Sequence, residues 1–412
     1  MLRLANPVRR YAWGSAHALP DLLGTPSDGR PQAELWVGAH PGAPSTVPGP
    51  GRALDAEIAD RPDALLGDAV RRRFGDRLPY LTKLLAAERP LSLQVHPDAE
   101  RARRRHGEEV AAGLPPADRR YPDPWHKPEL LVALTPTVAL AGLREPADAA
   151  ALLAALGPRA GLAVAGVLDA LGTPGAAEGR VRGALAGVLA LGAEEVRTVT
   201  EAAATLVRAP ARVGGARVDP EPHALALHLA ARFPGDPGVV ASYLLHPVAL
   251  AVGEGLPVGA GVLHCYVSGT GVEVMAASDN VLRAGLTDKV VDRAELLAVV
   301  DARPCRPPVL RPTPERVADG VLRRVYRGGA DEFALDLLDV DTAEPVVVHD
   351  AGGPRTVLAL AGAVAVATGR GRCGLAAGEA VLVPDADGAV RLSGRGRAAL
   401  VAVPGPGRGA DR

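Results

Sequence analysis

The sequence predicts a mainly β protein that contains two related β modules and an all-α helical insertion. Short alternations of apolar and polar residues, bounded by glycine and proline, occupy both ends of the chain. The middle of the chain instead repeats apolar residues at three- and four-residue spacing, which is typical of amphipathic helices. At 412 residues the chain exceeds one ordinary core, so two or three domains are expected.

Composition limits the functions that this chain can have. It is 48% hydrophobic and 23% charged, with a formal net charge of −1, an ordinary balance for a soluble globular protein. A near-neutral charge argues against binding to nucleic acids or membrane surfaces, because both need a basic field. We therefore expect neither a nucleic acid nor a membrane among its partners.

Cysteine usage and the N-terminal sequence indicate a cytoplasmic protein. Cys265, Cys305 and Cys373 are odd in number and widely spaced, so they predict neither a disulfide framework nor a CxxC metal site. Residues 1–15 lack the apolar core of a signal peptide, and no uncharged apolar run reaches transmembrane length.

Residues 1–144 are rich in proline, glycine and short apolar runs, which predicts a β-sandwich or barrel with helical excursions. A highly charged segment at 101–113 predicts a short helix within this region. The predicted strands are Glu34–Gly38, Leu78–Leu85, Leu91–Val95 and Leu130–Leu134.

Residues 145–235 form the predicted helical insertion. They are rich in Ala and Leu, and prolines after Gly157 and Thr173 mark turns between helices. His223 and His228 are five residues apart, a spacing that does not put two ligands on one helix face, so we interpret both as structural.

Strands resume after the insertion. We assign residues 236–305 to the same module as residues 1–144, and residues 306–405 to a second module. The Gly-, Pro- and Arg-rich tail at 406–412 is expected to be disordered.

The two modules resemble each other in sequence. Residues 256–274 and 375–392 match when Gly259 is placed beside Gly378, and this register puts His264 opposite Val383. The second module therefore lacks the histidine of the first, and we predict that it is structural and has no metal ligands.

The strand at 91–95 carries an unusual polar face. Side chains two residues apart on a strand share a face, so Ser92, Gln94 and His96 point the same way. This face either lies in water at the edge of a sheet or lines a polar cavity.

A later segment favours the cavity. Gly269-Thr270 lies between two alternating runs and predicts a two-residue hairpin turn. Counting outward from that turn puts His264, Tyr266 and Glu273 on one face. Three such side chains would be costly in an apolar core, so a polar cavity is the better interpretation.

The segment HKPELL completes a candidate metal site. Lys127 and Glu129 have the same parity and can face the same cavity. Imidazole and carboxylate ligands suit zinc, with a position left for water or substrate, although the same set could bind manganese or iron. The candidate ligands are Gln94, His96, Glu129 and His264.

Longer motifs carry a resemblance to a known family. They are WGS (13–15), AELWVGAHPGAPS (33–45), PYLTKLLAAERPLSLQVHPD (79–98), HKPELLVALTP (126–136), SDNVLRAGLTDK (278–289) and DEFAL (331–335). In order and spacing they resemble type I mannose-6-phosphate isomerases. The resemblance implies a bicupin, meaning two cupin (jelly-roll) modules, with a helical insertion. It also implies one Zn²⁺ per chain and interconversion of mannose 6-phosphate and fructose 6-phosphate in carbohydrate metabolism.

The resemblance also implies roles for individual residues. It makes Gln94, His96, Glu129 and His264 the zinc ligands and Arg283 the active-site arginine. It places Lys127, Glu273 and Tyr266 in the pocket, with Glu273 and Lys127 as candidates for the catalytic base.

The remaining candidates concern the phosphate of a phosphosugar substrate. Ser92, Arg283 and Lys289 are the available partners. The family usually has Asn where this chain has Trp125, and Pro where it has Asp288, which affects the local shape around Lys289.

Two other functions compete with a phosphosugar isomerase. A metal-dependent bicupin oxidoreductase would use iron and oxygen, but it usually has a histidine-richer metal face than one containing Gln94. A non-catalytic sugar-binding bicupin could dispense with the metal, whereas the first module keeps its candidate ligands. The isomerase is therefore the preferred hypothesis, and we expect it to act as a monomer.

Overall fold

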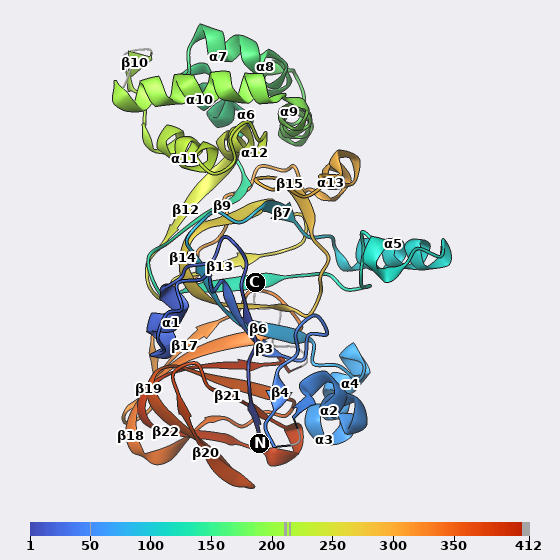
Figure 1. Ribbon diagram of the computed structural model, residues 1–412, viewed down its shortest axis with the longest axis vertical. Coiled ribbons are helices and arrows are strands. Elements are labelled where there is room, and N and C mark those ends of the chain that lie inside the picture. Colours follow the sequence, from blue (N-terminus) through green and yellow to red (C-terminus); the bar gives the residue numbers. More distant parts are fainter. Residues whose placement is uncertain (50, 210–211, 214–215, 406–412) are drawn as a thin grey trace.

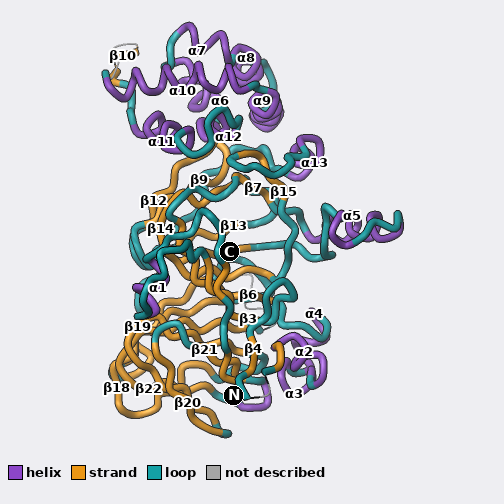
Figure 2. The backbone as a smooth tube through the Cα atoms, viewed as in Figure 1, coloured by secondary structure: helices purple, strands orange, loops and turns teal. Residues whose placement is uncertain are grey.

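Two large β-sheets and a group of helices make up the fold (Figure 1). The computed structural model describes residues 1–49, 51–209, 212–213 and 216–405, so the predicted disordered tail at 406–412 lies outside the described residues. Figure 2 shows strands in the lower two thirds of the view, with helices above them and shorter helices at both sides. The prediction of a mainly β protein with additional helices is confirmed.

The ten-stranded sheet is centred on β14. This strand pairs with β9 through its first half and with both β6 and β8 through its second half. All eight residues of β6 are buried, which explains its nearly continuous apolar sequence. The strands of this sheet are β2 (Val8–Arg9), β3 (Glu34–Gly38), β6 (Tyr80–Ala87), β7 (Leu93–Val95), β8 (Glu129–Ala133), β9 (Thr137–Leu143), β12 (Leu245–Leu250), β13 (Gly255–Val258), β14 (His264–Ala276) and β15 (Leu282–Gly285).

The eight-stranded sheet consists mostly of residues after 314. Its first strand, β1, comes from the N-terminus and covers the edge of β21. The predicted assignment of residues 1–144 to the first module therefore does not hold for residues 2–4, because β21 takes them as its hydrogen-bonding partner. The strands of this sheet are β1 (Leu2–Leu4), β16 (Glu315–Ala318), β17 (Val321–Tyr326), β18 (Ala334–His349), β19 (Arg355–Thr368), β20 (Gly371–Ala376), β21 (Ala380–Val383) and β22 (Val390–Ala402).

Six helices occupy the segment that the Ala- and Leu-rich pattern marks. In α10, Val196, Val199, Ala203 and Leu206 are buried at three- and four-residue spacing, as expected of an amphipathic helix. The helices are α6 (Pro146–Ala154), α7 (Pro158–Ala163), α8 (Ala165–Gly172), α9 (Ala177–Ala190), α10 (Ala193–Arg208) and α11 (Glu221–Ala230). A short pair of strands, β10 (Arg212–Val213) and β11 (Ala216–Arg217), interrupts them, so this segment is not entirely helical as predicted. His223 is buried against the Tyr243 hydroxyl, at 3.0 Å.

The remaining elements are short excursions from the sheets. Helix α5 projects from the body of the molecule (Figure 1) and begins at Asp98, whose carboxylate accepts a hydrogen bond from the Arg101 amide. These elements are α1 (Ala18–Leu23), β4 (Thr46–Val47), β5 (Arg52–Ala53), α2 (Leu54–Asp60), α3 (Pro62–Leu66), α4 (Asp68–Phe74), α5 (Ala99–Ala111), α12 (Gly238–Ala241) and α13 (Arg293–Val299), with 3₁₀ turns at Pro116–Asp118, Ser242–Leu244 and Asp385–Asp387.

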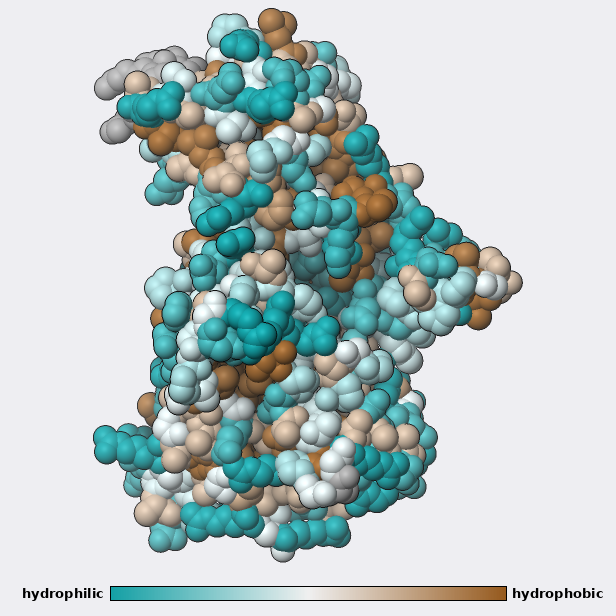
Figure 3. Space-filling model, viewed as in Figure 1, coloured by the Kyte–Doolittle hydropathy of each residue, from teal (hydrophilic) through white to brown (hydrophobic). Residues whose placement is uncertain are grey.

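The molecular surface in Figure 3 is a mixture of polar and apolar areas. On the face shown, apolar side chains form separate patches among polar ones, the ordinary pattern for a surface facing water. Within the described part of the chain, no helix is both long enough and apolar enough to span a bilayer.

The two sheets share one core. Leu84 and Leu130 of the first sheet and Leu335 and Leu358 of the second belong to the same buried cluster. Tyr80 connects the sheets through hydrogen bonds as well. Its hydroxyl donates to the Val401 carbonyl at 3.2 Å and lies 3.1 Å from the Thr356 hydroxyl.

A repeated turn corrects the internal register predicted from sequence. Gly253 and Gly378 have φ values of 86° and 81°. In each case the next residue is a glutamate, Glu254 or Glu379, whose carboxylate accepts a hydrogen bond from a backbone amide three residues earlier. A strand follows each turn, β13 or β21. In this turn the equivalent of Gly378 is Gly253 rather than Gly259.

The predicted hairpin at Gly269-Thr270 is wrong, because β14 continues through these residues as one strand. A β-bulge at Val267 shifts the pairing of β14 with β9 by one residue. After the bulge, the side chains of β14 exchange faces relative to those before it. His264 and Tyr266, which precede the bulge, therefore share a face with Glu273, which follows it. Gly269 has a φ of 121°, and a Cβ atom there would lie 2.2 Å from the Thr137 hydroxyl, which explains the glycine.

We predict that Tyr80→Phe lowers the free energy of unfolding by about 1–3 kcal/mol, because it removes a buried donor of the first sheet and leaves its acceptors in the second sheet, at Val401 and Thr356, without it. Chemical denaturation monitored by circular dichroism measures the change. Tyr11→Phe, at a half-exposed tyrosine, is the matched control. Equal stability of the two variants would contradict the proposed link between the sheets.

Candidate metal centre and active site

Three buried side chains converge at one point of the ten-stranded sheet. Glu129 begins β8, His264 begins β14, and His96 follows directly after β7. One ligand atom from each lies within 4.8 Å of the others. The Glu129 carboxylate is 3.2 Å from His96 Nε2 and 3.3 Å from His264 Nε2.

The outer nitrogens of both imidazoles are already occupied. His96 Nδ1 lies 2.8 Å from the Asn280 carbonyl, and His264 Nδ1 lies 3.0 Å from the Val262 carbonyl. A carbonyl oxygen can only accept, so each Nδ1 carries the proton and each Nε2 presents a lone pair. Two lone pairs thus face a carboxylate, and His96 Nε2 and Glu129 Oε2 have no hydrogen-bond partner among the described residues. A cation between them would satisfy all three groups.

The electrostatics of the cluster favour the metal-binding forms of its residues. Burial lowers the pKa of His96 to about 4, so this imidazole is neutral at pH 7. Burial alone would raise the pKa of Glu129, but the positive charge of Lys127 outweighs it and holds the pKa well below its usual value. The Lys127 ammonium donates to the Glu129 carboxylate at 2.8 Å.

Gln94 lies beside the cluster in a row of cross-strand neighbours. In the strand registers, Gln94 of β7 faces His264 of β14 on one side and Arg283 of β15 on the other. The Gln94 side-chain amide is 3.4 Å from His264 Nε2. A rotation of the Gln94 amide by 180° would turn its oxygen, instead of its nitrogen, toward His264 Nε2.

A cavity of about 610 Å³ opens next to the cluster. Most of the residues singled out in the sequence line it. His96 and His264 do not; they are fully buried behind its wall. The predicted residues that line the cavity are Ser92, Gln94, Lys127, Glu129, Tyr266, Glu273, Arg283 and Lys289.

Sequence reasoning missed a buried ion pair in this cavity. The Lys83 ammonium lies 3.0 Å from the Glu273 carboxylate and 3.3 Å from that of Glu34. Burial alone would lower the pKa of Lys83, but the carboxylates raise it above its usual value. Burial raises the pKa of Glu273. The sequence pattern that could have indicated this ion pair is a single charged residue in each of two largely apolar strands, Glu34 in β3 and Lys83 in β6.

The loop carrying Lys289 is held in place by a residue that sequence reasoning also missed. The Asp236 carboxylate accepts hydrogen bonds from the amides of Gly238 (2.6 Å), Leu286 (2.9 Å) and Thr287 (3.3 Å). Among the described residues, Leu286 is the one non-glycine residue with positive φ, 54°. Asp236 thus stabilises a strained turn at the cavity wall, and no periodicity in the sequence indicates this role.

Comparison with known proteins identifies the family. Residues 1–146 match the family model described as "Phosphomannose isomerase type I, catalytic domain". The mannose-6-phosphate isomerase of Salmonella typhimurium is 36% identical over 97% of this chain and 99% of its own length. The chain belongs to the type I phosphomannose isomerase family. Family members called mannose-6-phosphate isomerase in Arabidopsis thaliana and Rattus norvegicus are 30% and 34% identical, over 93% and 73% of this chain.

Solved structures of the phosphomannose isomerase family agree with this assignment. A mannose 6-phosphate isomerase bound with zinc and yttrium has a TM-score of 0.84 and 33% identity, and covers 98% of this chain and 99% of its own. A zinc-bound mannose 6-phosphate isomerase has a TM-score of 0.83 with the same identity and coverage.

We predict that Glu129→Gln weakens binding of a divalent metal by about 100-fold or more, because it removes the negative charge between the two imidazole lone pairs. Competition with a chromogenic chelator measures the affinity. Glu332→Gln is the matched control, since Glu332 is also buried and lies 2.7 Å from a histidine, His126, outside the cluster. Equal metal affinity in the two variants would contradict the assigned centre.

Proposed function

We propose that this protein is a zinc-dependent mannose-6-phosphate isomerase that interconverts mannose 6-phosphate and fructose 6-phosphate. The observation that carries the proposal is the buried pair of imidazole lone pairs facing the Glu129 carboxylate. The full-length similarity to mannose-6-phosphate isomerases supports the reaction. The zinc in related solved structures supports the choice of metal.

The proposal includes the architecture of a bicupin. Residues 1–144 with 236–305 would form the catalytic cupin module, apart from strand β1, and residues 306–405 the second. The helical insertion would span 145–235. The turns at Gly253 and Gly378 support a relationship between the modules. We further propose a cytoplasmic monomer; its three free cysteines are compatible with a reducing compartment.

The four proposed zinc ligands are His96, His264, Glu129 and Gln94. Two nitrogens and one carboxylate suit zinc, and the Gln94 amide supplies a fourth ligand from the cavity side. When bound, zinc would act as a Lewis acid toward a sugar oxygen in the cavity.

Basic side chains on one wall of the cavity would bind the substrate. Arg283 is half-buried, its pKa is lowered by burial, and no carboxylate lies within 4 Å of its guanidinium among the described residues. It is therefore available to stabilise the charge that develops on the enediol oxygens. Ser92 and Lys289, which line the same cavity, would hold the phosphate group.

Glu273 is our proposed base for the proton transfer between C1 and C2. The reaction needs a carboxylate whose pKa lies above its ordinary value, and burial has that effect on Glu273. The alternative base, Lys127, is engaged in an ion pair with Glu129, to which its ammonium donates a hydrogen bond at 2.8 Å. Tyr266 shares the cavity, and its buried hydroxyl has no partner among the described residues, so it can donate to a sugar oxygen.

The competing functions lack comparable support. An oxidoreductase or a non-catalytic sugar-binding protein would not account for similarity to isomerases along the whole chain.

We predict that dialysis against a strong chelator abolishes the conversion of mannose 6-phosphate and that added Zn²⁺ restores it, because the metal supplies the Lewis acid. A coupled assay for fructose 6-phosphate measures the activity, and elemental analysis measures the zinc. Full activity in protein shown to be free of metal would rule out the proposed mechanism.

We predict that Arg283→Ala lowers kcat roughly 100-fold, because a charged donor to the developing oxyanion is lost. The zinc content should not change, since Arg283 is not a ligand. Arg293→Ala, at an exposed arginine of α13, should match the parent in both measurements. Loss of zinc from the Arg283 variant would mean that this residue supports the metal instead.

A further inference from the structure

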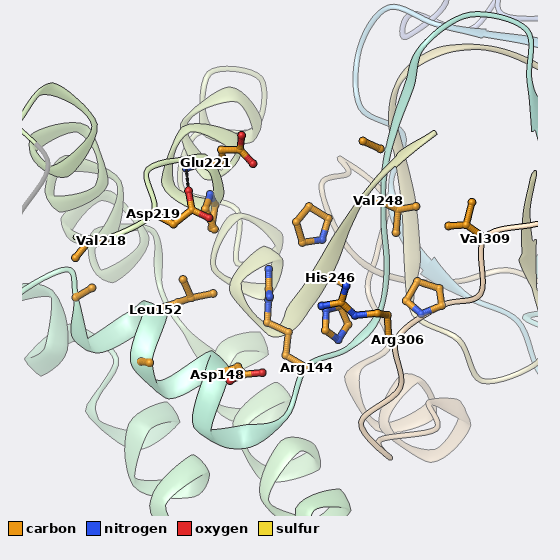
Figure 4. A pocket seen from close by; sticks show the side chains of 16 residues that line it. Arg144, Asp148, Leu152, Val218, Asp219, Glu221, His246, Val248, Arg306 and Val309 are labelled. Atoms are coloured by element: carbon orange, nitrogen blue, oxygen red, sulfur yellow. Dashed lines mark hydrogen bonds between the residues drawn. The ribbon is translucent and has the colours of Figure 1, made fainter. Parts of the chain in front are cut away.

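A second cavity, of about 700 Å³, lies where the helices meet the ten-stranded sheet (Figure 4). It is lined by residues of α6 and β12, by the segment that enters α11, and by the linker after Cys305. None of its lining residues lines the cavity beside the metal cluster. Its volume is within the range of small-molecule sites in proteins.

Three basic side chains face this cavity together. Figure 4 shows Arg144, His246 and Arg306 beside one another on one wall. Burial lowers the pKa of His246, and the positive charges of Arg144 and Arg306 lower it further, which agrees with their closeness.

The two arginines have no acceptor in the part of the chain that the structure describes. Among the described residues, no carboxylate oxygen lies within 4 Å of either guanidinium, and neither side chain donates a hydrogen bond. Arg144 Nε is buried without a partner. An unpaired buried donor is costly, whereas the nearby Arg303, just before the linker, is paired with Asp301. Both guanidinium groups are therefore available to bind an anion, and the carboxylate of Asp148 lines the same cavity beyond 4 Å from them.

The opposite wall has a different chemistry. Asp219 and Glu221 lie across the cavity from the arginines, with apolar contacts from Leu152 and Val218 between them (Figure 4). The Asp219 carboxylate accepts one hydrogen bond, from the Glu221 amide, and keeps free acceptor capacity. Carboxylates accept hydrogen bonds from hydroxyl groups, so this wall suits the hydroxylated part of a ligand whose anionic end is at the arginines.

We propose that this cavity is a second binding site, for a phosphate ester that carries hydroxyl groups. Arg144 and Arg306 bind the phosphate, in the bidentate geometry that guanidinium groups favour, and Asp219 and Glu221 accept from hydroxyls. The site is close to the metal cluster but separate from it. His246 of β12 pairs with Ala141 of β9, and Ala141 pairs with His264 of β14, so the two sites are two strands apart.

The test uses glucose 1-phosphate as the probe and His246 as the reporter. Zinc-loaded protein with ¹³C-labelled histidine is titrated and followed by NMR, and the His246 signal is assigned by its loss in His246→Gln. We expect a saturable shift of this signal. Arg306→Gln, at an exposed side chain, should weaken binding about tenfold or more, because one charge-assisted contact is lost. Arg144→Gln should do the same.

Controls distinguish this site from others. Arg303→Gln, three residues before Arg306 but paired with Asp301, should bind like the parent. Arg283→Ala should keep the His246 response, because that residue lines the other cavity. Inorganic phosphate should bind more weakly than the ester, since it cannot reach Asp219 and Glu221.

Three results would overturn the proposal. One is an unchanged His246 signal at saturating probe. Another is equal affinity in the parent and in Arg306→Gln. The third is equal affinity for inorganic phosphate and the ester, which would exclude recognition of hydroxyl groups.

Discussion

The burial of the Glu129 carboxylate is the constraint on which the rest of the site depends. A carboxylate in the centre of a sheet is unstable without positive charge around it. Lys127 supplies one such charge from the same strand segment. His96 does not, because burial keeps its imidazole neutral at pH 7, and the Nδ1 protons of both imidazoles point at the carbonyls of Asn280 and Val262 rather than at Glu129. The cluster would therefore gain stability from a further cation. Glu129, the most buried acidic group of the cluster, is also its best metal ligand.

Local patterns were sufficient to predict much of this structure. The alternation in the strand at 91–95 placed Ser92 and Gln94 on one face, and both line the cavity. The parity of Lys127 and Glu129 likewise predicted their contact. β3 has its predicted bounds, and the other predicted strands differ by no more than two residues. These features depend only on the two-residue period of a strand, which a sequence displays directly.

Features that depend on pairing between distant segments were not predictable in this way. The bulge at Val267 exists because β14 changes partners along its length, and no local pattern distinguishes it from a hairpin. The contact of Lys83 with Glu34 and Glu273 joins three strands. The match between the two modules was anchored on the wrong glycine for a related reason. Alternating apolar residues match in several registers. The Gly-Glu turn at Gly253 and Gly378 favours one of them, but only once the backbone geometry of the turn is known.

Asp236 has a consequence for the evolution and engineering of the chain. It follows the last long helix of the insertion, yet its carboxylate holds the backbone of the cavity loop at Leu286. A variant with the helices deleted would have to retain Asp236 on the C-terminal side of the deletion, because its carboxylate fixes the backbone of the loop at Leu286. The helices also share a buried core with the ten-stranded sheet, in which Leu153 and Val188 pack in the same cluster as Leu93 and Leu140, so an exchanged insertion would have to keep that contact as well as Asp236.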